Sequence, residues 1–102
     1  MKNHSKAVNS VFLSDDKKMI VSCSNDNSII VWVLNKETKI FEILQTLNQF
    51  DNPINAVCLS KDKQTIIAGC EESTIKVWNF NKEDEEFLYS QTLRALTLPF
   101  RR

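Results

Sequence analysis

The sequence predicts an all-β fold built from two four-stranded antiparallel sheets of the same kind. The 102-residue chain repeats itself once without a gap, at an offset of 46 residues. Each copy contains four short stretches with apolar side chains, and the first three of each copy are enriched in Val and Ile, whose branched side chains pack well on a pleated surface and favour extended backbone. Polar turn residues separate these stretches at the spacing typical of hairpin-connected strands.

The repeat is clearest at two tryptophans. The segment SNDNSIIVW ends at Trp32, and the segment CEESTIKVW ends at Trp78. Further identities at the same offset are Asn9/Asn55, Val11/Val57, Leu13/Leu59, Ser14/Ser60, Asp16/Asp62, Lys17/Lys63, Ile20/Ile66, Asn35/Asn81, Phe41/Phe87, Gln45/Gln91 and Leu47/Leu93. Self-similarity at a fixed period of about 20–50 residues indicates a repeat architecture.

Each copy is expected to form its strands in the same order. In the first copy they lie near Val8–Leu13, Met19–Cys23, Ser28–Leu34 and Lys39–Leu47. In the second copy they lie near Ile54–Leu59, Thr65–Gly69, Thr74–Phe80 and Glu86–Leu93. The turns between them are rich in Asp, Asn and Ser, which hydrogen-bond nearby backbone and tolerate unusual dihedral angles.

The third strand of each copy indicates how the sheets are arranged. Ile75 and Val77 share one face of their strand, and Lys76 and Trp78 share the other, because side chains alternate along a strand. In the first copy, residues 29–33 are apolar on both faces. A sheet that is apolar on both faces needs a neighbour on each side. We therefore expect a stack of similar sheets rather than a two-sheet sandwich.

The segments SCSNDNSIIVW (residues 22–32) and TIKVW (residues 74–78) resemble the WD40 repeat, and the resemblance covers roughly residues 3–93. It implies two WD40-type blades, a fragment of a β-propeller, because propellers close a circle of typically four to eight blades. Well-formed blades of that family carry a buried hydrogen-bonded quartet. The resemblance assigns this structural role in the first copy to His4, Ser22, Asp26 and Trp32.

The second copy departs from the family pattern. Trp78 is kept, but Phe50 stands in place of the histidine, Ala68 in place of the serine and Glu72 in place of the aspartate. We therefore expect the second sheet to depend on apolar packing alone. Neither copy has the Asp that closes the family motif, since Val33 and Asn79 follow the tryptophans.

Composition and motifs argue against several functions. The net charge is zero, which gives no sign of nucleic-acid binding, and no apolar run is long enough to span a bilayer. No phosphate-binding glycine loop, metalloprotease motif or serine nucleophile motif is present. The three cysteines lack the close pairs of a metal site, and we expect them to be reduced core residues. We expect a non-enzyme without cofactor or metal. Without a secretory signal we also expect a cytoplasmic protein, with the nucleus left open.

The repeat also sets the expected domain boundaries. Residues 1–47 form the first blade, residues 48–93 the second, and residues 94–102 a tail outside the repeat. The tail holds all three arginines, Arg94, Arg101 and Arg102. Residues 1–93 contain lysines but no arginine. Our hypothesis is that this tail comes from a frameshift, a retained intron or a truncated gene model.

The resemblance implies a non-catalytic scaffold that binds partner proteins or peptides through loops and rims. The candidate contact residues are those of the polar turns: Asp15, Asp16, Lys61, Asp62, Glu83, Asp84 and Glu85. The acidic run that includes the last three is otherwise an ordinary solvated loop. The alternative is a structural fragment of a larger WD40 protein, one that has no activity of its own or that associates with itself to complete a propeller. That larger protein could carry a catalytic domain elsewhere.

Overall fold

The computed structural model describes residues 4–48, 53–70 and 74–94 of the chain. They form two four-stranded antiparallel sheets, with strand orders β1-β2-β3-β4 and β5-β6-β7-β8, and contain no helix. The all-β prediction of two blades is therefore confirmed. The strands are β1 (Val8–Leu13), β2 (Met19–Ser24), β3 (Ile29–Leu34), β4 (Phe41–Leu47), β5 (Ile54–Leu59), β6 (Thr65–Cys70), β7 (Thr74–Asn81) and β8 (Glu86–Arg94).

The two sheets share the details of strand pairing as well as strand order. Ile20 pairs with Trp32 in the first sheet, and Ile66 pairs with Trp78 in the second. The register shifts between Val31 and Trp32 where β3 meets β4, and between Val77 and Trp78 where β7 meets β8. Such bulges increase the local twist of a sheet. The repeat in sequence is thus a repeat in backbone geometry.

The hairpin turns are built by the same side chains in both sheets. Ser14 Oγ donates to Asp16 Oδ1 over 2.6 Å, and Ser60 Oγ donates to Asp62 Oδ1 over 2.6 Å. Each carboxylate also accepts a backbone N–H two residues later. Asn35 and Asn81 hold the β3–β4 and β7–β8 turns, since the Oδ1 atom of each accepts two backbone N–H groups. The turn chemistry expected for Asp, Asn and Ser is therefore present twice.

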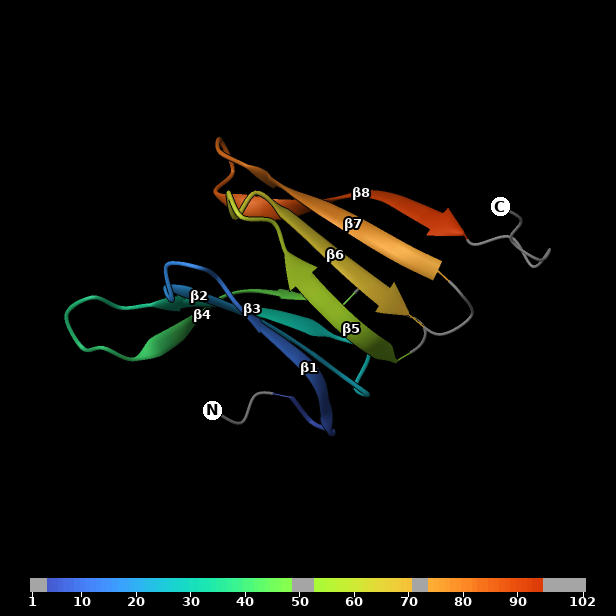
Figure 1. Ribbon diagram of the computed structural model, residues 1–102, viewed down its shortest axis with the longest axis horizontal. Coiled ribbons are helices and arrows are strands. Elements are labelled where there is room, and N and C mark those ends of the chain that lie inside the picture. The colour runs from blue at the N-terminus through green and yellow to red at the C-terminus, as the bar shows by residue number, and fades with distance from the viewer. Residues whose placement is uncertain (1–3, 49–52, 71–73, 95–102) are drawn as a thin grey trace.

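The sheets lie face to face, with β5 against β1 and β2 (Figure 1). One core lies between them. The first sheet contributes Val21, Cys23, Ile29, Val31 and Leu47, and the second contributes Ile54, Val57, Leu59, Ile66, Ala68, Trp78 and Phe87. Trp78 therefore lies inside the interface, while Trp32 lies on the opposite face of its own sheet. The two sheets are therefore stacked in the same orientation, so that both indoles point the same way along the stack. In a two-sheet sandwich both indoles would share one surface.

Each sheet has a second face that the other sheet does not cover. We call the Trp32 side of the first sheet the first open face; it includes Val8, Val11, Leu13, Ile20, Ser22 and Trp32. The second open face lies on the far side of the second sheet and includes Cys58, Ile67, Gly69, Ile75, Val77 and Leu93. Hollows of about 200 Å³ and about 210 Å³ lie on these two faces.

Several details differ from the expectations drawn from sequence, and one end of each of β2, β3, β6, β7 and β8 lies one residue from its expected place. Strand β4 begins at Phe41 instead of Lys39, because Lys39 adopts a φ of 65° in the preceding turn. Arg94, assigned above to the tail, is the last residue of β8 and pairs with Thr74. Cys58 is exposed, so the expectation that all three cysteines belong to the core is wrong for this residue. Residues 95–102 of the expected tail lie outside the described part of the chain.

No helix in the described part of the chain has the length and apolar character that a membrane span requires.

Candidate functional site

The first sheet carries a connected chain of polar side chains at its Trp32 face. Trp32 Nε1 donates to Ser22 Oγ over 3.0 Å, and Ser22 Oγ lies 2.8 Å from His4 Nε2. His4 Nδ1 lies 3.1 Å from Asp26 Oδ2. The structure therefore brings together the four residues that the resemblance assigned to the quartet. They come from the N-terminal segment, β2, the β2–β3 turn and β3.

The direction of the hydrogen bonds follows from the two ends of this chain. An indole N–H can only donate and an ionised carboxylate can only accept. In the His4 tautomer that carries its proton on Nδ1, Ser22 accepts from Trp32 and donates to His4 Nε2, and the Nδ1–H donates to Asp26, so that every polar atom along the path has a partner. Among the described residues, no buried side-chain nitrogen or oxygen lacks a partner.

Asp26 is the negatively charged end of this series of hydrogen-bonded side chains. Partial burial opposes ionisation of its carboxyl, but the hydrogen bonds from Ser28, from the Ser5 backbone N–H and from His4 outweigh that cost and lower its pKa to about 2. The Ser5 N–H lies 2.8 Å from Asp26 Oδ2, and the Ser28 N–H lies 3.0 Å from Asp26 Oδ1. The carboxylate is thus ionised near neutral pH and ties the N-terminal segment to the β2–β3 turn.

Ser28 belongs to this group although the sequence analysis did not single it out. Its Oγ lies 3.1 Å from His4 Nδ1 and 2.5 Å from Asp26 Oδ1. The short spacing Asp-x-Ser was the available signal, because an Asp side chain commonly bonds backbone two residues later. Ser28 had instead been expected to begin the third strand.

The equivalent group of the second sheet can be followed only in part. Phe50 and Glu72 lie outside the described residues. Ala68 is fully buried and has no polar side-chain atom to stand in for Ser22. Trp78 is buried in the core and makes an edge-to-face contact with Tyr89, with ring centroids 5.9 Å apart. Aromatic packing is thus one of the contacts that hold Trp78.

The charged turns that were expected to contact partners lie together at one edge of the molecule. The β1–β2, β3–β4, β5–β6 and β7–β8 turns all project to the left in Figure 1, and we call them the turn edge. Asp16 of the first sheet forms an ion pair with Lys63 of the second there. The side chains of Asp15, Lys61, Glu83, Asp84 and Glu85 are exposed along this edge.

Asp16 and Asp62 have a clear structural use. The Lys63 ammonium, the Ser14 hydroxyl and the Lys18 N–H hold the pKa of Asp16 well below its usual range. Hydrogen bonds from Ser60 and from the Gln64 N–H lower the pKa of Asp62. Both carboxylates therefore stay ionised while they shape their turns, which leaves the remaining turn-edge residues as the freer contact positions.

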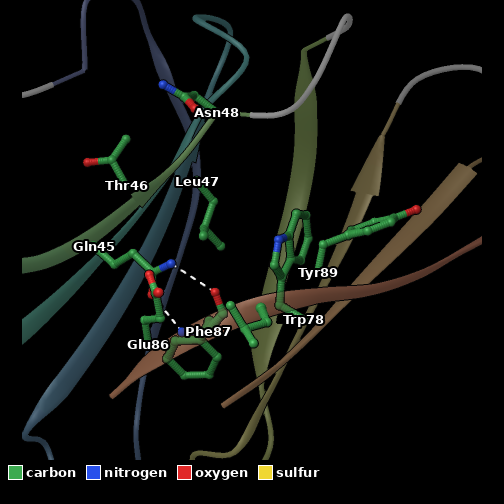
Figure 2. A pocket seen from close by; sticks show the side chains of 9 residues that line it. Gln45, Thr46, Leu47, Asn48, Trp78, Glu86, Phe87 and Tyr89 are labelled. Carbon is green, nitrogen blue, oxygen red and sulfur yellow. Dashed lines mark hydrogen bonds between the residues drawn. The ribbon is translucent and has the colours of Figure 1, made fainter. Parts of the chain in front are cut away.

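Two side chains that sequence reasoning missed link the sheets through backbone atoms. Gln45 Nε2 donates to the Phe87 carbonyl over 2.8 Å, and the Phe87 N–H donates to Gln45 Oε1 over 2.7 Å (Figure 2). Asn9 Nδ2 donates to the Ile54 carbonyl over 2.9 Å. The signal was present in the sequence, because both residue types recur in the second copy as Gln91 and Asn55.

A cavity of about 150 Å³ lies beside the Gln45 contact, between β4 and β8. Leu47, Trp78, Phe87 and Tyr89 line it together with polar atoms of Gln45 and Asn48 (Figure 2). Within the described part of the chain, no group of three or more His, Cys, Asp and Glu side chains is placed to hold a metal ion. The described contacts around this cavity are hydrogen bonds and apolar packing.

Comparison with known proteins supports the same architecture. The family model described as the WD domain, G-beta repeat matches residues 1–33 and 41–79. The chain belongs to the WD40-repeat family. The crystal structure of Sqt1 from Saccharomyces cerevisiae superimposes with a TM-score of 0.78 at 9% sequence identity, over 94% of this chain and 25% of that one. This chain thus spans about a quarter of the length of that structural neighbour. No curated protein matches the sequence of the chain at a significant level.

Proposed function

We propose that this WD40 chain is a non-catalytic interaction module that holds partner proteins or peptides at its turn edge. The observation that carries the proposal is the ordering of charged turns on a rigid two-sheet support. Binding residues are commonly found on loops that a rigid scaffold positions. The Ser-x-Asp and Asn-centred turns fix their own backbone, so exposed side chains next to them are presented in defined positions.

The contact residues we propose are Asp15, Lys61, Glu83, Asp84 and Glu85. They include both signs of charge within one edge, and such patterns select partners and set the rate of encounter more than they add raw affinity. Asp16 and Asp62 act indirectly, by holding the turns. Membership of the WD40-repeat family supports a binding role in general, and the partner is defined here only by its complementary charge.

The proposal can be tested with two variants of equal charge change. Lys61→Glu alters the turn edge, and Lys6→Glu makes the same charge change at an exposed position of the N-terminal segment, away from that edge. Tagged chains are incubated with lysate of the source organism, and retained proteins are quantified by mass spectrometry. We expect proteins that bind the unmodified chain to be lost at least fivefold by the turn-edge variant and kept by the control. Equal retention by the two variants would refute the turn edge as the binding surface.

A second role is favoured by the two open faces. Apolar side chains on both outer faces are typical of a surface that another protein covers. In this role the chain is a structural part of a larger ring of blades, with no independent activity. Deleting these two blades would then mainly leave the larger ring incomplete, rather than abolish the binding of one partner.

A further inference from the structure

The interface between the two sheets contains three polar links in addition to its apolar core. The side chains of Asn9 and Gln45, both on the first sheet, bond the backbone of Ile54 and Phe87 on the second sheet. Asp16 in the β1–β2 turn pairs with Lys63 in the β5–β6 turn. These links lie at β1, at β4 and at the turn edge. Together they fix the orientation of one sheet on the other.

Each half of these links is repeated on a sheet face that is still open. At the 46-residue offset, Asn9, Gln45 and Asp16 become Asn55, Gln91 and Asp62 of the second sheet. Their targets Ile54, Phe87 and Lys63 correspond to Val8, Phe41 and Lys17 of the first sheet. The three side chains that reach forward are identical in both copies. The chain therefore carries a second full set of these linking side chains at one end of the stack and a second full set of their targets at the other.

The apolar residues show the same correspondence. Val57 is 7% exposed in the interface and its counterpart Val11 is 64% exposed; Leu59 is 4% exposed and Leu13 is 47%. On the opposite side, Ile29 is 0% exposed and its counterpart Ile75 is 39%. The first open face thus matches the surface that the second sheet buries. The second open face matches the surface that the first sheet buries.

We propose that the occupant of each open face is a second copy of this chain, associated head to tail. In this contact Asn55, Gln91 and Asp62 of one copy engage the Val8 carbonyl, the Phe41 backbone and the Lys17 ammonium of the next. The interface inside the chain supports this occupant, since the two open faces carry the residues that correspond to those on the two sides of that interface. The inference concerns the open faces and does not depend on partner binding at the turn edge.

The contact between copies is weaker than the contact within one copy. Cys58 and Gly69 on the second open face correspond to the larger Phe12 and Cys23, and Val8 and Ser22 on the first stand where Ile54 and Ala68 do. A Cβ added at Gly69 would meet no atom within 4 Å. Lost side-chain volume leaves gaps and forfeits contacts. Association is therefore expected to depend on concentration.

A head-to-tail contact closes into a ring if its rotation allows, and otherwise continues as a filament. Propellers close with about four to eight blades, so rings of about two to four chains are expected. Sedimentation velocity of the unmodified chain should show a discrete species at a multiple of 11.8 kDa that dissociates on dilution. A single species at the mass of one chain at all concentrations would overturn the proposal.

Two blocking variants test the direction of the contact. Gly69→Arg places a charged side chain on the second open face, and Val11→Arg places one on the first. Each variant alone should sediment as a monomer, because one of its two faces is blocked. An equimolar mixture should form a 1:1 dimer and nothing larger, because the intact first face of one variant meets the intact second face of the other. A dimer formed by either variant alone, or a mixture that stays monomeric, would contradict head-to-tail association.

The control is Glu37→Arg, which adds an arginine at the exposed β3–β4 turn away from both faces and should assemble like the unmodified chain. Circular dichroism identifies any variant that fails to fold. A readout independent of variants is alkylation of Cys58, which is exposed in the single chain. Peptide mapping should find its alkylation slowed at least tenfold as concentration rises, and an unchanged rate would contradict the proposal.

Discussion

Ser22 occupies the centre of the polar chain in the first sheet, because its single hydroxyl both accepts from Trp32 and donates to His4. Substitution by alanine reproduces the residue that the second sheet has at the equivalent position, Ala68. The two sheets thus differ in polar content at one buried position while the backbone around it is the same. The difference makes the contribution of the hydroxyl measurable.

Ser22→Ala should lower the free energy of unfolding by about 1–3 kcal/mol, the cost of leaving buried polar partners unsatisfied. Urea denaturation followed by tryptophan fluorescence measures the loss. Ser5→Ala is the control, because the Ser5 contact to Asp26 uses the backbone N–H, and its effect should stay within about 0.5 kcal/mol. Equal effects of the two substitutions would show that the hydroxyl chain adds nothing.

The lowered pKa of Asp26 gives stability a specific pH dependence. A carboxyl whose pKa falls from 3.8 to about 2 on folding adds stability above pH 4, and that contribution disappears as the pH falls through 2. Asp26→Asn lacks this term. The difference in unfolding free energy between the native chain and Asp26→Asn should therefore shrink between pH 4 and pH 2. A difference that stays constant over this window would contradict the assignment.

At the scale of elements, the turns store backbone strain in matching places. Lys17 and Lys63 have φ near 61°, and Lys39 and Glu85 have φ of 65° and 54°. These are equivalent pairs in the repeat, and the left-handed region is unfavourable for residues with a Cβ. Hydrogen bonds from the Ser-x-Asp and Asn-centred turns hold the strained residues in place.

Lys39→Gly should therefore raise the free energy of unfolding by about 0.5–1 kcal/mol, because glycine relieves the left-handed strain. Thermal unfolding detects the change as a higher Tm. Lys36→Gly in the same turn has no positive φ to relieve and should leave Tm unchanged or lower it. A fall in Tm for Lys39→Gly would show that its side chain makes a contact worth more than the strain.

Strand order could be predicted from the sequence because period-2 patterns and turn residues agreed in both copies. The exact ends could not. Lys39 and Ser28 carry residue types compatible with a strand, and only the closed turn geometry assigns them to turns. The quartet could be assigned because its spacing resembles a known motif. The recurrence of Asn9 and Gln45 in the second copy is visible in the sequence, but their partners could not be predicted, because a polar strand residue looks the same in sequence whether it faces water or a neighbouring backbone.

At the scale of the molecule, the two sheets share one core and should unfold together. The Gln45 contact is one of the polar links of their interface that can be removed without changing the apolar core. Its repeat equivalent Gln91 is exposed and offers a matched comparison in the single chain. Comparing substitutions of Gln45 and Gln91 separates the free energy of linking the two sheets from the free energy of forming each sheet.

Gln45→Ala should destabilise the chain by about 1–3 kcal/mol, since the Phe87 N–H and carbonyl lose their partners. Gln91→Ala should change stability by no more than about 0.5 kcal/mol. Both are made in the Gly69→Arg background, so that each is compared as a single chain by urea denaturation. A similar loss for both glutamines would mean that Gln45 acts within its own sheet.

The common register of the two sheets has a genetic consequence. The side chains that reach from the first sheet to the second are encoded in the first repeat. Their equivalents, which would reach a third sheet, are encoded in the second repeat. Unequal recombination that adds one 46-residue segment in frame would therefore lengthen the array by a blade that already carries the linking side chains and their targets, whereas a partial copy would lack some of them.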